Sequence, residues 1–187
     1  SIIIYAIQPL WWSWLEFTNP DHYRDETWAK FEKAWMNKSS KFLIRQLGNR
    51  SGIYSGVAAT ILSNRKDLAT IEPLVKILKH SRNQRARTRV IYILIDFDDP
   101  RAIQALMDIV KSGRSHPDYI DALTALSLIK YEEAYPYVVE LARMNDEYAV
   151  YMLEKFEKPE AIPLLEKMIE KIKSNDFAAR VRKGSIE

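Results

Sequence analysis

The sequence predicts an all-α fold of solenoid type, in which pairs of helices follow one another along the chain. The composition is the first reason: 187 residues hold only five glycines, and 47% of them are hydrophobic. Chains rich in Leu, Ile, Ala, Glu and Lys and poor in glycine favour helices over tight β-turns. The other two reasons are a pair of sequence series that share one spacing and the positions of the prolines.

The first series marks the start of a helix in each repeat. Four apolar segments align without gaps, at residues 70–74, 102–106, 134–138 and 161–165. The offsets between them are 32, 32 and 27 residues. A fixed period of this length is typical of repeat architectures built from one helix pair per unit.

The second series has the same irregular spacing. Its members are residues 59–62, 91–94, 123–126 and 150–153, whose final leucines are again 32, 32 and 27 residues apart. Two series in step predict a unit of helix, turn, helix, turn. The shorter last interval indicates a five-residue deletion between the two helices of the repeat that starts at Ala134.

The prolines fall where this unit places helix starts. Pro73, Pro136 and Pro163 each lie in the first turn of an expected helix, where the missing amide hydrogen costs little. The segments 98–100 and 157–159 combine an acid with a proline between the end of one repeat and the start of the next.

Parts of the chain resemble a known family, the HEAT-like repeats of bacterial and archaeal proteins, including the type found in phycobilisome lyases. Ala86-Arg87, the apolar run 90–94 and Asp99-Pro100 carry the resemblance best, and it extends over roughly 39–173. It implies a right-handed α-solenoid of about four to five HEAT-like helical hairpins, with the second helices on a concave side. The family's arginine position is filled differently in the other repeats, by Ser55, Tyr119 and Asp146.

The chain divides into three expected parts: an N-terminal segment 1–37, a repeat array 38–174, and a C-terminal cap and tail 175–187. The first part contains all five tryptophans. Trp28, Phe31 and Trp35 are three and four residues apart, which predicts one helical stripe that covers the first repeat as an aromatic cap.

The alternative for the N-terminal segment is contact with a membrane. Residues 1–15 carry no charged side chain, and Trp11, Trp12 and Trp14 follow an apolar run, as at a membrane interface. Fifteen residues are too few to span a bilayer as a helix, which needs about 20. The chain starts with serine, so this segment could also be the end of a processed or truncated one.

Positive charge is concentrated in one quarter of the chain. Residues 38–89 contain twelve Lys and Arg against two acids, for a net charge of +10, whereas residues 90–145 have a net charge of −4. We interpret this stretch either as a solvated face or as a surface for anionic groups. Arg87 is assigned a structural role by the family resemblance. The candidate partner-binding residues are Lys76, Lys79, Arg82, Arg85, Arg89, Tyr92 and, in the C-terminal half, Tyr148.

Three kinds of partner fit a basic surface. Single-stranded nucleic acid favours aromatic side chains among the basic ones for stacking, and only Phe42, Tyr54 and Tyr92 are near in sequence. An acidic protein or an anionic membrane needs no such aromatics. We therefore expect an acidic protein partner first. The absence of cysteine does not identify a compartment, because cysteine-free proteins occur in both the cytosol and the periplasm. The location stays open, with a cytoplasmic and a membrane-associated one as the candidates.

No catalytic, metal or cofactor site is predicted. The three histidines lie in different segments, and there is no glycine-rich phosphate loop. Asp96, Asp98 and Asp99 could suggest a carboxylate site like that of HEAT-like DNA glycosylases, but aspartate before proline is typical of a turn that caps the next helix. We expect a non-catalytic interaction or scaffold module. The alternatives are a nucleic-acid-binding or DNA-repair protein and, by resemblance alone, a lyase subunit.

Overall fold

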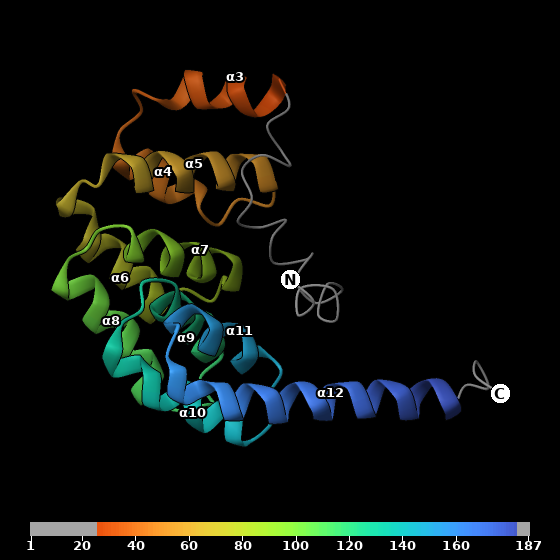
Figure 1. Ribbon diagram of the computed structural model, residues 1–187. Helices are drawn as coiled ribbons and strands as arrows, with labels where there is room; N and C mark the ends of the chain where they lie inside the picture. Colours follow the sequence, from red (N-terminus) through yellow and green to blue (C-terminus); the bar gives the residue numbers. More distant parts are fainter. Residues whose placement is uncertain (1–25, 183–187) are drawn as a thin grey trace. The chain divides into compact units, whose positions relative to one another are not determined.

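The structure, a computed structural model, describes residues 26–182 of the chain and is all-α, as predicted. Ten α-helices and three short 3-10 turns make up this range, and no strand occurs in it. The helices follow one another as the repeat pattern requires (Figure 1). The described residues fall into two compact units that divide between Ile93 and Leu94, within one helix.

The first unit contains five helices and one 3-10 turn. They are α3 (Glu26–Trp35), α4 (Ser40–Gln46), α5 (Gly52–Arg65), η1 (Leu68–Thr70), α6 (Ile71–His80) and α7 (Gln84–Ile95), whose last two residues belong to the second unit. Side-chain oxygens of Ser39 and Ser51 accept backbone N–H bonds at the starts of α4 and α5. Such N-caps fix where each helix begins.

The second unit continues the same pattern. Its elements after α7 are α8 (Pro100–Lys111), α9 (Tyr119–Leu128), η2 (Glu132–Ala134), α10 (Tyr135–Arg143), α11 (Tyr148–Phe156), η3 (Pro159–Ala161) and α12 (Ile162–Arg182). The helices α8 and α9 pack as one pair and α10 and α11 as the next, and α9 also packs on α11. The predicted deletion is seen as two nine-residue helices, α10 and α11, joined by residues 144–147.

Both sequence series mark helices, as predicted. The segments of the first series open α6, α8, α10 and α12, and those of the second lie inside α5, α7, α9 and α11. They supply many of the core residues; fully buried examples are Leu62, Leu74, Leu94, Leu106 and Leu126.

A third repeated feature ends the second helix of each repeat. The residue after this helix, or a few residues beyond it, has a positive φ at Lys66, Asp98, Lys130 and Glu157, between 48° and 54°. These positions are again 32, 32 and 27 residues apart. None is glycine, although the left-handed region favours it. The chain therefore turns toward the next repeat in the same way each time.

The aromatic residues of α3 lie against α5. Trp28 is buried, Phe31 contacts Tyr54 with ring centroids 4.6 Å apart, and Trp35 contacts both Phe42 and Tyr54. These contacts cover the N-terminal side of the first repeat within the first unit. Trp11, Trp12 and Trp14, the candidates for membrane contact, lie outside the described residues.

The C-terminal helix is longer than any other described helix. Figure 1 shows α12 continuing well past α10 and α11, and it runs without interruption through residue 174, the expected boundary of the repeat array. Met168 packs into the unit, whereas Glu170 and Lys171 on the following turn are exposed. Among the described helices, none is long and apolar enough to cross a lipid bilayer.

Candidate protein-interaction surface

The outward side of α6 carries the central part of the predicted basic stretch. Ile71, Leu74 and Leu78 are buried and anchor the helix in the first unit. The residues between them face outward because a helix turns by 3.6 residues. Lys76 and Lys79 are both exposed.

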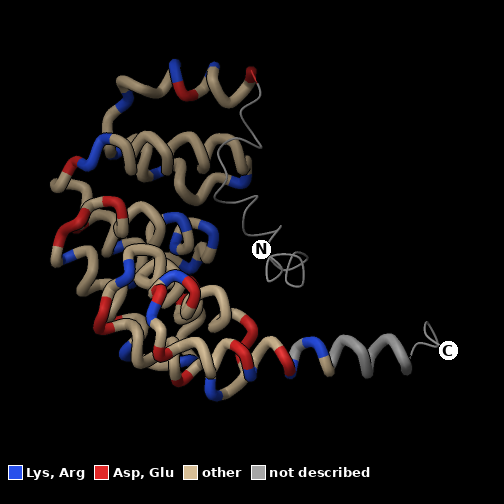
Figure 2. The backbone as a smooth tube through the Cα atoms, in the orientation of Figure 1, with Lys and Arg blue, Asp and Glu red and all other residues tan. Residues whose placement is uncertain are grey.

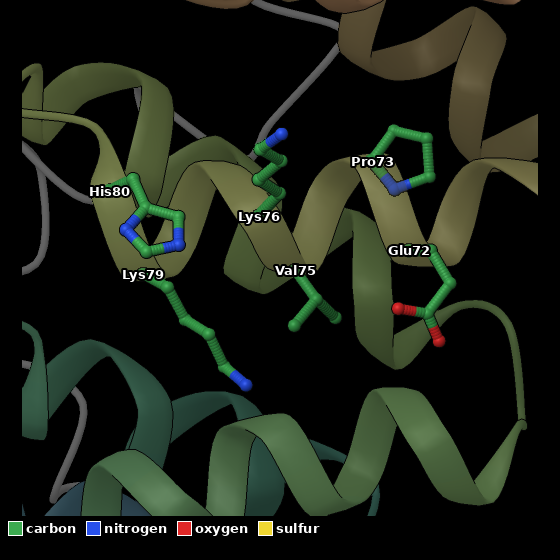
Figure 3. Close-up of a pocket in the computed structure, with 6 residues that line it drawn as sticks. All are labelled: Glu72, Pro73, Val75, Lys76, Lys79 and His80. Carbon is green, nitrogen blue, oxygen red and sulfur yellow. The ribbon is translucent and has the colours of Figure 1, made fainter.

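The outward residues of α6 form two adjacent stripes that line an open hollow. One stripe consists of Glu72, Val75 and Lys79, and the other of Pro73, Lys76 and His80. Figure 3 shows Glu72, Val75 and Lys79 pointing to one side of the helix and Pro73 and Lys76 to the other. Most of the lining surface is apolar, with the cations toward the C-terminal end of the helix.

The turn after α6 and the start of α7 carry further arginines, which differ in the contacts they make. Arg82 is exposed. Arg85 and Arg87, by contrast, donate to backbone carbonyls: Nη1 of Arg85 is 3.0 Å from the oxygen of Arg50, and Nη1 of Arg87 is 2.9 Å from that of Ser81. Figure 2 shows Lys and Arg grouped at the start of α7. Within this group, Arg85 therefore binds the turn before α5 and Arg87 binds the turn after α6.

Arg89 and Tyr92 lie further along α7 and are half-buried. The pKa of Arg89 is lowered to about 10, because burial removes water from its guanidinium and because the positive charge of Arg85 is near. Arg89 still carries its charge at neutral pH. Its partial burial makes it less accessible to a partner than the lysines of α6.

Three cations and a histidine thus form what we call the α6 basic surface: Lys76, Lys79, Arg82 and His80. Within residues 26–182, no hydrogen bond or ion pair engages the side chains of these four residues. Lys76, Lys79 and Arg82 carry like charges within seven residues of the chain, and an anion would be attracted to all three. The arrangement is therefore suited to binding negative charge.

Two of the three aromatic side chains considered for stacking, Phe42 and Tyr54, are engaged elsewhere, and the third, Tyr92, is half-buried on α7. Phe42 packs edge-on against Trp35, with ring centroids 5.2 Å apart, and the ammonium of Lys38 lies 5.9 Å from the centroid of the Phe42 ring. Tyr54 packs against Phe31 and Trp35. Neither ring offers a stacking platform beside the α6 basic surface.

Tyr148 is 55% exposed and is the first residue of α11. It belongs to the second unit, whereas the basic candidates belong to the first. Next to it, Asp146 accepts the backbone N–H of Tyr148 and binds the guanidinium of Arg114 at 3.0 Å. Tyr148 is thus accessible, and its backbone N–H is held by Asp146.

The aspartates at the end of α7 act as turn residues. Asp99 accepts the backbone N–H of Arg101 at 2.9 Å and pairs with its guanidinium. The pairing with the guanidinium holds the pKa of the Asp99 carboxyl below its usual value. Asp98 is the residue with positive φ. In the described range, no group of His, Asp and Glu has an arrangement that could hold a metal ion.

The sequence reasoning missed part of this surface. His80, Val75 and Glu72 were not among the candidates, although all three line the hollow with Lys76 and Lys79. The available signal was the helical pattern of this segment, in which all three residues lie one or two positions from the apolar residues Ile71, Leu74 and Leu78. Arg85 was a candidate, but its contact with a carbonyl 35 residues away is visible only in three dimensions.

One comparison with known proteins agrees with the architecture. Residues 40–127, which cover α4 to α9 except the last residue of α9, match the family of HEAT repeats. Comparison with curated proteins gives no significant match. HEAT repeats commonly serve as protein-interaction scaffolds and are generally not enzymes.

Proposed function

Because residues 40–127 of this chain are HEAT repeats, we propose that the protein is a non-catalytic scaffold that binds an acidic protein through the α6 basic surface. The observation that carries the proposal is the set of three cations and His80 on α6 and the following turn, which no described hydrogen bond or ion pair engages.

The charge distribution supports an acidic partner. The stretch 38–89 contains only two acids, so the α6 basic surface has little local charge compensation. A complementary negative surface on a partner raises the association rate and excludes partners of like charge. The hollow that Lys76, Lys79 and His80 help to line supplies apolar area, which a protein interface uses for affinity.

A protein partner fits the surface better than nucleic acid. Sequence-independent binding of single strands combines basic residues with aromatic rings on which bases stack. Phe42 and Tyr54 pack within the aromatic cluster of α3, α4 and α5 instead. Nucleic acid binding through phosphate contacts alone is the second candidate function, and it differs in its steep dependence on salt.

The proposal is tested by affinity capture from the native lysate after nuclease treatment. The wild-type chain is compared with a triple variant, Lys76→Gln, Lys79→Gln and Arg82→Gln, which removes three charges and keeps side chains that favour helices. The control triple variant changes three exposed lysines of the second unit, Lys111→Gln, Lys167→Gln and Lys171→Gln.

We expect one defined protein of acidic composition to be retained by the wild-type chain and by the control, and to be lost by the α6 triple variant. Equal retention by all three proteins contradicts the proposed surface. Capture that disappears after nuclease treatment, with no protein retained, supports the nucleic-acid alternative instead.

A further inference from the structure

We infer that the partner presents a short amphipathic helix to α6, with one apolar side chain on Val75 and its acids toward Lys79, His80 and Arg82. This inference rests on the proposed function and specifies the partner segment. The partner helix is identified by the order of its charged and apolar residues, which must complement the order on α6.

The stripe Glu72, Val75, Lys79 determines this order. It reads acid, apolar, base from the N-terminal to the C-terminal end of α6, and Figure 3 shows the three side chains pointing to the same side. Read in the same direction along α6, a complementary segment therefore has the order base, apolar, acid. Glu72 disfavours a segment that is acidic along its whole length, because like charges would face each other at that end.

The spacing of the stripe suits a helix. At a rise of about 1.5 Å per residue, Glu72 and Lys79 are about 10 Å apart along the axis, with Val75 between them. A partner helix that crosses at a small angle matches this with residues at i, i+3 and i+7. The second stripe extends the site, since Pro73 adds apolar area, Lys76 adds positive charge and His80 adds a polar ring.

Val75 is the residue that separates this inference from simple charge attraction. It is half-buried, and it lines the hollow together with the exposed Lys76 and Lys79. Attraction between charges alone does not depend on an apolar contact at this position. Binding of a helix that packs an apolar side chain against Val75 does depend on this contact.

The experiment uses two synthetic alanine-based helical peptides and the full chain. The first carries Lys, Leu and Glu at relative positions i, i+3 and i+7, followed by two more Glu; the second has Ser in place of Leu. Binding is measured by fluorescence anisotropy at low salt. The variants are Val75→Thr, which keeps the side-chain shape, and Lys79→Gln, with Lys171→Gln as the control and circular dichroism as the check on folding.

We expect the leucine peptide to bind wild-type protein about fivefold to tenfold more tightly than the serine peptide. The Val75→Thr change should remove that difference and leave the serine peptide unaffected, whereas Lys79→Gln should weaken both peptides. Equal binding of the two peptides that depends on Lys79 overturns the helix inference and leaves the proposed function standing. Failure of both peptides to bind contradicts both claims, because the α6 basic surface should hold a multiply acidic peptide at low salt.

Discussion

The indole ring of Trp28 lies directly over Gly56. A Cβ atom at Gly56 would lie 2.6 Å from Cη2 and 2.8 Å from Cζ3 of Trp28, closer than real Cβ contacts allow. Glycine in the middle of α5 costs helix propensity, yet here it gives the ring of α3 a place to pack. The N-terminal aromatic segment and the first repeat are joined at this point.

Gly56→Ala should therefore destabilise the protein. We expect the free energy of unfolding to fall by about 1–3 kcal/mol, as for other overpacked core positions. The matched control is Gly52→Ala at the start of the same helix, where an added Cβ meets no atom within 4 Å. Chemical denaturation followed by tryptophan fluorescence checks both; equal stability of the two variants would contradict the packing described.

The positive-φ position after α5 gives a prediction of the opposite sign. Lys66 has φ of 48° and its backbone N–H bonds to the oxygen of Leu62. Glycine adopts this conformation without the steric cost of a Cβ atom. Lys66→Gly should raise the free energy of unfolding by about 0.5–1 kcal/mol. Lys111→Gly, at the end of α8, should lower it, and thermal denaturation compares the two.

The ion pair between Lys130 and Glu157 joins two such positions in successive repeats. Their side-chain atoms are 2.5 Å apart, and this hydrogen bond lowers the pKa of the Glu157 carboxyl. Because the folded-state pKa is lowered, the stabilisation is present above the unfolded glutamate pKa of about 4.3 and is lost as pH falls through the folded value.

Lys130→Gln should accordingly lower the melting temperature slightly at pH 7 and leave it equal to that of the wild type in strong acid. The effect should be small and weaken with salt, since both side chains are largely exposed. Lys171→Gln serves as the control for loss of a single exposed charge. A difference that persists unchanged at low pH would show that the ion pair is not its source.

Asn83 connects the α6–α7 turn to the preceding repeat. Its Nδ2 donates to the carbonyl of Gly48 at 3.0 Å and its Oδ1 accepts the backbone N–H of Ala86 at 3.2 Å. Asn83→Ala removes both bonds and should cost about 1–2 kcal/mol of unfolding free energy. Asn83→Asp keeps the acceptor alone and should cost less. Equal losses in the two variants, measured by urea denaturation, would contradict this division of roles.

The repeat architecture was predictable from the sequence because each helix pair buries the same positions. The leucines of the second series are 32, 32 and 27 residues apart, and they are buried residues of α5, α7, α9 and α11. The positive-φ series was not predicted, since Lys66 and Glu157 carry no glycine signal. A left-handed residue without glycine depends on the packing around it.

The candidate surface was predictable only in part. Lys76 and Lys79 were exposed as expected, because they alternate with the buried Leu74 and Leu78. Arg85 was not distinguishable from them by sequence, since its bond to the Arg50 carbonyl depends on how two turns meet. Composition shows where positive charge is concentrated along the chain, but not which of these side chains form hydrogen bonds within the protein.

The equilibrium affinity of the captured partner for the α6 triple variant tests the central claim most directly. Isothermal titration calorimetry compares wild type, the variant with Lys76, Lys79 and Arg82 changed to Gln, and the control with Lys111, Lys167 and Lys171 changed to Gln. We expect the dissociation constant to rise at least about 30-fold for the α6 variant, because three positive charges are removed from the binding surface, and to stay within about twofold for the control. Equal dissociation constants for the wild type and the α6 variant would show that the partner binds elsewhere on the chain.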